Sequence, residues 1–134
     1  MNDHEAIRAL IHAYVDAVDR ADFEGLGALF EHGVLRSPRG EARGAAAVTD
    51  WYRGVRVYKD GTPQTWHHVF GIEIDVDGDR ARAHSYVTAI QHRKPIVSAT
   101  YDDTFERVDG TWRFATRAVT MDLVGDLTGH FVLS

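Results

Sequence analysis

Apolar residues recur every three or four positions in the first part of the chain, which predicts helices. We expect the first helix from about Asp3 to Arg20, with Asp3 as its N-cap. Its buried face would consist of Ile7, Leu10, Ile11, Tyr14, Val15 and Val18. Asp22 is expected to cap a short second helix, and a third helix is predicted over roughly Gly44 to Val57.

The period changes to two from Thr65 onward, which predicts strands. After a short strand at 34–37, we expect long strands from Thr65, at about 81–91, at about 97–108 and at 111–123. Turns are predicted at 77–79 and at Asp109-Gly110. Because helices precede a run of antiparallel strands, the fold class is α+β, with helices covering one side of a curved sheet.

Composition limits the classes of function. The 134 residues suit one domain, expected over 1–134. A net charge of −5 and the lack of a Lys/Arg run argue against nucleic acid or an anionic membrane as a partner. Without cysteine there is no disulfide or thiolate metal site. No stretch resembles a signal peptide or the roughly 20 apolar residues of a membrane span, so we expect a cytoplasmic protein.

His68 is the first candidate for a functional residue. It alternates with Trp66, Phe70 and Ile72, which places it on the apolar face of its strand and His67 on the opposite face. An imidazole on that face loses water and needs a partner. The structural interpretation is a core or interface histidine bonded to a backbone carbonyl. The functional interpretation is a group that transfers a proton.

Asp19 is the candidate partner of His68. It lies at the edge of the apolar stripe and in the last turn of the first helix, where a carboxylate faces the negative end of the helix dipole. It could equally be a solvated acid paired with Arg20. If Asp19 meets His68, the carboxylate would orient the imidazole as a general acid or base, and this chemistry needs no metal or organic cofactor.

Four further residues are candidates for binding a substrate. Tyr14 could reach into a cavity and polarise a carbonyl oxygen, and Trp51 could close the pocket. Gln91 would lie at the pocket rim, and Tyr101 would share an inward face with Asp103, which needs a partner there. Each of these also fits a packing role. The spacing of the histidines does not predict a metal site.

Three segments resemble the SnoaL-like group. They are IRALIHAYVDAVDRADFEGLGALF at 7–30, TWHHVFGIEIDVDGDRARAHSY at 65–86 and YDDTFERVDGTWRFATRAV at 101–119. The resemblance implies the cone-shaped fold of the nuclear transport factor two-like superfamily, with helices packed into a bent antiparallel sheet around an internal pocket. Scytalone dehydratase of this group uses an Asp–His pair, which Asp19 and His68 resemble by motif position. Its active-site tyrosine before the Asp is replaced here by Val18.

The resemblance implies two classes of function. The first is a cofactor-independent lyase, cyclase or isomerase that acts on a small hydrophobic, polyketide-like carbonyl compound. Asp19 would then orient His68, and His68 would be the acid or base. The alternative is a non-catalytic ligand-binding or scaffold module, in which the two residues form a buried structural bond. A homodimer is expected under either function, by analogy with the family.

Overall fold

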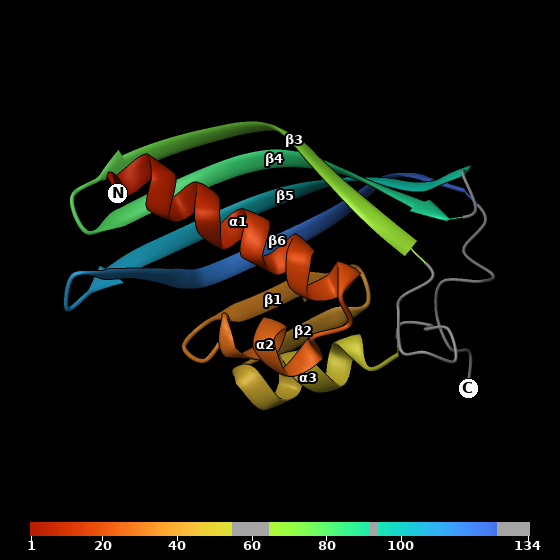
Figure 1. Ribbon diagram of the computed structural model, residues 1–134, viewed down its shortest axis with the longest axis horizontal. Helices are drawn as coiled ribbons and strands as arrows, with labels where there is room; N and C mark the ends of the chain where they lie inside the picture. The colour runs from red at the N-terminus through yellow and green to blue at the C-terminus, as the bar shows by residue number, and fades with distance from the viewer. Residues whose placement is uncertain (55–64, 92–93, 126–134) are drawn as a thin grey trace.

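The computed structural model describes residues 1–54, 65–91 and 94–125. Within these ranges three helices precede or interrupt the strands of one curved sheet (Figure 1). The helices are α1 (Asp3–Asp19), α2 (Phe23–Ala28) and α3 (Ala45–Tyr52). The strands are β1 (Val34–Ser37), β2 (Gly40–Arg43), β3 (Thr65–Asp77), β4 (Arg80–Gln91), β5 (Lys94–Val108) and β6 (Thr111–Val124).

The sheet runs in the order β2-β1-β6-β5-β4-β3 and does not close on itself. Helix α1 lies across its concave face, while α2 and α3 lie beside the β1–β2 hairpin (Figure 1). The predicted α+β class and the curved sheet around the N-terminal helix are therefore confirmed. The sheet is mixed rather than wholly antiparallel, because β1 pairs with β6 in parallel.

Two short elements differ from the prediction. The turn predicted at 38–40 belongs to a hairpin in which Ser37 pairs with Gly40, and its second strand, β2, was not expected. Helix α3 ends at Tyr52, and the rest of the helix predicted to Val57 lies outside the described residues.

The core forms where the apolar stripe of α1 meets the inner face of the sheet. Ile7, Ile11 and Val18 are almost completely buried, as their helical spacing predicts. They pack in one cluster with inward residues of the long strands, among them Val87, Ala99, Phe105 and Phe114. Full burial of each large aliphatic or aromatic side chain stabilises the fold by roughly 1.5–3 kcal/mol, so this cluster holds α1 on the sheet.

Asn2, rather than Asp3, is the N-cap of α1. Its side-chain oxygen accepts a hydrogen bond from the backbone N–H of Glu5 at 2.9 Å. Asp3 therefore becomes the first helical residue, and its carboxylate is directed to the sheet.

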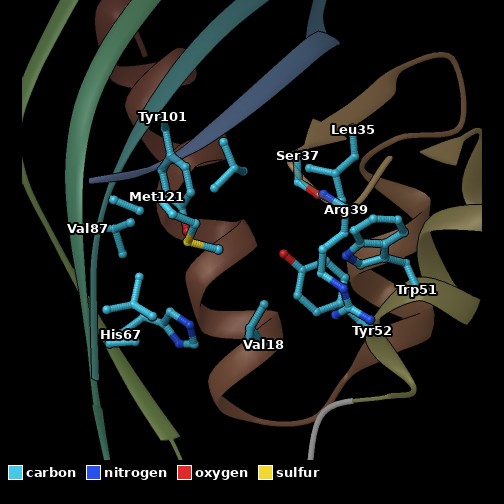
Figure 2. Close-up of a pocket in the computed structure, with 14 residues that line it drawn as sticks. Val18, Leu35, Ser37, Arg39, Trp51, Tyr52, His67, Val87, Tyr101 and Met121 are labelled. Carbon is cyan, nitrogen blue, oxygen red and sulfur yellow. The ribbon is translucent and has the colours of Figure 1, made fainter. Parts of the chain in front are cut away.

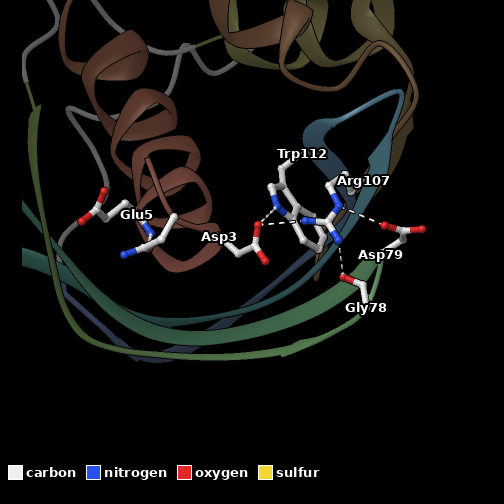
Figure 3. Close-up of polar contacts among 7 residues, drawn as sticks. Asp3, Glu5, Gly78, Asp79, Arg107 and Trp112 are labelled. Atoms are coloured by element: carbon white, nitrogen blue, oxygen red, sulfur yellow. Dashed lines mark hydrogen bonds and ion pairs between the residues drawn. The ribbon is translucent and has the colours of Figure 1, made fainter.

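The carboxylate of Asp3 ties the start of α1 to β5 and β6 (Figure 3). It accepts hydrogen bonds from Arg107 at 2.9 Å and from the indole of Trp112 at 3.1 Å. Arg107 also donates to Asp79, next to the β3–β4 turn, at 2.9 Å. The bonds from Trp112 and Arg107 hold the pKa of the Asp3 carboxyl below its usual value. This network fixes one end of the helix whose other end carries Asp19.

Bulges interrupt the alternation of several strands, and two of them change which residues face the core. In β3 the register shifts between Phe70 and Glu73, and Gly71 there adopts a positive φ of 63°. A second shift lies between Thr104 and Phe105 of β5, where the facing segment of β6 contains one extra residue. Each of these two bulges exchanges the inner and outer faces of the positions that follow it.

The bulge in β6 changes which of its side chains face the core. Uninterrupted alternation through β6 would place Thr116 and Ala118 on the same face as Trp112 and Phe114, which are buried. Thr116 instead pairs with Thr104, and the two hydroxyls share a hydrogen bond on the outer side of the sheet. Arg117, the next residue, faces inward.

Candidate active site

A pocket opens between the last turns of α1, the inner face of the sheet, the β1–β2 hairpin and α3 (Figure 2). It contains about 790 Å³ of space, including the part that opens to solvent. Its lining is largely apolar, with a few polar side chains, and this composition is typical of small-molecule sites. The lining residues are Val18, Leu35, Ser37, Arg39, Trp51, Tyr52, His67, Val87, Ala89, Val97, Ala99, Tyr101, Val119 and Met121.

Asp19 and a histidine meet at the edge of this pocket, but the histidine is His67. Nδ1 of His67 lies 2.8 Å from Oδ1 of Asp19. The carboxylate also accepts the backbone N–H of His67, at 3.1 and 3.2 Å to its two oxygens. The side chain of His67 is 14% exposed and that of Asp19 is 4% exposed, so the contact is largely shielded from water.

The predicted contact between His68 and Asp19 is therefore wrong. His68 is exposed on the outer face of the sheet, with Trp66 and Phe70. The cause is the bulge at Gly71. Before it the odd positions of β3 face inward, and after it the even positions Ile72 and Ile74 do. Extrapolating the alternation backwards from Ile72 assigned the wrong histidine to the inner face.

Asp19 contacts a histidine, as predicted, although the histidine differs from the expected one. Asp19 is buried at the last residue of α1, where it opposes the helix dipole, and the two bonds from His67 compensate for that placement. Arg20, its alternative partner, lies instead 4.0 Å from the exposed carboxylate of Asp16.

The contact determines which ring nitrogen of the neutral imidazole carries the proton. An ionised carboxylate can only accept hydrogen bonds, so Nδ1 of His67 carries the proton and its N–H donates a hydrogen bond to Asp19. In the neutral ring, Nε2 is then the basic nitrogen. Because His67 lines the pocket, this arrangement suits a general base that acts through Nε2.

Three tyrosines surround the inner end of the pocket. Tyr52 and Tyr101 line it, whereas Tyr14 lies behind the wall and its hydroxyl bonds that of Tyr52. Burial raises the pKa of Tyr101 to about 12, and enclosure of the Tyr52 hydroxyl also raises the pKa of that group. Both hydroxyls therefore remain neutral hydrogen-bond donors at physiological pH.

The partner that Asp103 was expected to need is Arg117. The guanidinium donates to the two carboxylate oxygens at 2.7 and 2.8 Å, and both side chains are fully buried. The guanidinium carbon of Arg117 lies 3.8 Å from the ring centre of Tyr101 and 4.3 Å from that of Tyr14. This pair supports the tyrosines from behind. Arg117 was missed because the β6 bulge hides its inward orientation.

The other predicted binding residues are distributed unevenly. Trp51 and Tyr101 are in the pocket wall, while Tyr14 and Gln91 are buried outside it. Within the described ranges, no group of three or more His, Asp or Glu is arranged to hold a metal ion. None of the helices in those ranges is both long and apolar enough to cross a bilayer.

Solved structures share this fold. A putative scytalone dehydratase from Novosphingobium aromaticivorans is 29% identical, with a TM-score of 0.76 over 92% of this chain and 87% of that one. A protein of unknown function with a cystatin-like fold, from Nostoc punctiforme, is 22% identical, with a TM-score of 0.81 over 93% and 95%. A hexachlorocyclohexane dehydrochlorinase from Novosphingobium barchaimii is 20% identical, with a TM-score of 0.77 over 98% and 94%.

A comparison with curated proteins finds no match. The family comparison is decisive, because the model of the SnoaL-like domain matches residues 1–118. That range contains the three helices, the Asp19–His67 contact and β6 as far as Ala118. The chain belongs to the SnoaL-like domain family.

Proposed function

We propose that the protein is a cofactor-independent enzyme of the lyase, cyclase or isomerase type, acting on a small hydrophobic carbonyl compound. The observation that supports this most directly is the His67–Asp19 contact at the wall of an apolar pocket. A general base needs a fixed tautomer, a partner for the charge that it acquires, and access to the substrate. Asp19 meets the first two needs, and the position of His67 in the pocket wall meets the third.

In the proposed reaction, Nε2 of His67 removes a proton from the carbon next to a carbonyl group. The electron pair of the broken C–H bond moves onto the carbonyl oxygen, where the hydroxyl of Tyr52 or Tyr101 donates a hydrogen bond to the developing charge. The enolate can then expel a β-hydroxyl, which leaves as water with the proton returned from Nε2, or attack a second carbonyl, whose oxygen takes that proton. It can also regain the proton at another carbon. These outcomes are dehydration, cyclisation and isomerisation, respectively.

The similar structures agree with this class of chemistry. The names dehydratase and dehydrochlorinase denote the loss of water and of hydrogen chloride, which are both eliminations. The present chain has Val18 directly before its acid, so any hydroxyl that assists the reaction must come from elsewhere in the wall. Tyr52 and Tyr101 are the candidates.

The proposal can be tested without knowing the natural substrate. The probe is 5-nitrobenzisoxazole, a small apolar compound whose ring opens when a base removes its carbon-bound proton. We expect His67→Ala to lower the protein-catalysed rate by about a hundredfold. The matched control is His68→Ala, which removes the exposed neighbour and should leave the rate unchanged. Equal rates for wild type and His67→Ala would overturn the proposal.

The same experiment separates catalysis from a non-catalytic binding role. The pocket is not filled by aromatic side chains, since Trp51 and Tyr52 form its walls and Phe70 is on the outer face. A module that only binds ligands would take up the probe without accelerating its ring opening, and would do so with or without the imidazole of His67.

We also propose that the outer face of β3 and β4 joins two copies of the chain. Trp66, Phe70 and Tyr86 are 56%, 52% and 43% exposed there, and the rings of Phe70 and Tyr86 lie 5.7 Å apart. Exposed aromatic residues gathered on one face are typical of an interface between protein chains.

A further inference from the structure

We propose that the pocket selects substrates that carry an anionic oxygen group, such as a carboxylate, and that Arg39 binds this group. This inference extends the proposed function, because it concerns the same pocket and names the substrate class. Arg39 lies in the turn between β1 and β2, far in sequence from Asp19 and His67, and it was not among the predicted site residues.

The turn holds Arg39 at the pocket wall. Its backbone N–H donates to Oγ of Ser37 at 3.1 Å, and Ser37 also lines the pocket. Its guanidinium carbon lies 5.5 Å from the ring centre of Trp51, at a distance that allows a cation–π contact. Figure 2 shows Arg39 and Trp51 across the hollow from His67. A bound molecule could therefore present its reacting carbon to His67 and its other end to Arg39.

The charges around the pocket favour an anion at that end. The protein carries a net charge of −5, yet the described lining residues include no Asp or Glu. A guanidinium offers five donors in a planar fork that matches a carboxylate, so Arg39 can retain its contact with Trp51 while it binds an anion.

The test compares two probes that share one ring system, one of them anionic and the other neutral. They are 2-naphthoate and its neutral amide, 2-naphthamide, and binding is followed by NMR titration of backbone amides in the isotope-labelled protein. We expect the naphthoate to bind about tenfold more tightly than the amide, and to shift the amides of residues that line the pocket. Arg39→Gln should remove this tenfold preference while leaving the affinity for the amide unchanged.

Arg43→Gln is the matched control. It removes an exposed arginine of the same hairpin that pairs with Glu41, so the preference for naphthoate should remain. Equal affinity for the two probes, no saturable binding of the naphthoate, or an unchanged preference in Arg39→Gln would each overturn the inference. The titration is repeated in His67→Ala and needs no turnover. A failure of the catalytic proposal would therefore leave the preference for naphthoate intact.

Discussion

Nδ1 of His67 lies 2.8 Å from the carboxylate of Asp19, although 48 residues separate the two in the chain. The contact joins the last turn of α1 to the first residues of β3, and the backbone N–H of His67 reinforces it. Two bonds from one residue to one carboxylate restrict both the position and the rotation of the imidazole. This restriction underlies the proposed chemistry.

Replacing Asp19 by Asn should change the tautomer of His67. The carboxylate accepts the proton of Nδ1, whereas a neutral amide selects that tautomer less strongly and cannot balance the charge of a protonated ring. We expect a mixture of tautomers in nitrogen NMR spectra of the ring, and ring opening of the benzisoxazole probe slowed at least tenfold. Asp16→Asn, on the exposed side of the same helix, is the control. An unchanged tautomer in Asp19→Asn would contradict the prediction.

Gly71→Ala should destabilise the fold more than Gly78→Ala. Both glycines have a positive φ, 63° and 61°, so alanine costs about 1–2 kcal/mol at either position. At Gly71 the added carbon would also lie 2.9 Å from the ring of Tyr86, whereas nothing lies within 4 Å at Gly78. Urea denaturation should show the larger loss for Gly71→Ala. Equal losses would mean that the Tyr86 ring moves away without cost.

Breaking the buried pair of Arg117 and Asp103 should destabilise the fold strongly. Replacing both partners with apolar residues should destabilise it less. Arg117→Met leaves Asp103 charged and buried, so we expect a loss of about 3–5 kcal/mol in the free energy of unfolding. The double variant Arg117→Met/Asp103→Leu should recover much of this loss. The pair between Arg113 and Glu106 joins the same two strands but is about one-third exposed, so Arg113→Met should cost less than about 1 kcal/mol. Urea denaturation of the wild type and these variants measures the losses, and a double variant no more stable than Arg117→Met would contradict the prediction.

Stability should fall as the pH rises from about 10 to about 12. The pKa of Tyr101 is raised to about 12 in the folded protein, while its unfolded value is 10.0. Between these values the unfolded chain loses the proton and the folded protein keeps it, so ionisation favours unfolding. Urea denaturation at several alkaline pH values would measure the effect. Tyr101→Phe should flatten that part of the profile, and a wild-type profile of the same slope as the variant's would contradict the assignment.

The aromatic outer face should determine self-association. We expect sedimentation analysis to give the mass of a dimer for the wild type and of a monomer for the double variant Trp66→Ser/Phe70→Ser, since loss of the two exposed rings removes most of the apolar contact. Val108→Ser removes an exposed apolar residue at the end of β5 and serves as the control. A wild-type monomer, or a dimer that survives the double substitution, would exclude this interface.

Local sequence patterns predict the helices, most of the strands and the position of Asp19 in the candidate site. The spacing of Ile7, Ile11 and Val18 predicts the buried face of α1, and Asp22 caps α2 as expected, by accepting the N–H of Gly25. Asp109-Gly110 joins β5 to β6. These features follow from residue spacing and turn chemistry over a few residues.

The sequence by itself established that one imidazole of the adjacent His67 and His68 would face the core, because consecutive strand residues point to opposite faces. Only the tertiary structure decided which one. Gly71 within the strand was a signal for a bulge, but its effect depends on how β3 pairs with β4. The burial of Arg117 and the approach of Arg39 to the pocket likewise depend on pairings between distant segments. Since alternation holds only while the ladder of hydrogen bonds is unbroken, one extra residue reverses the faces, and local periodicity cannot locate that residue.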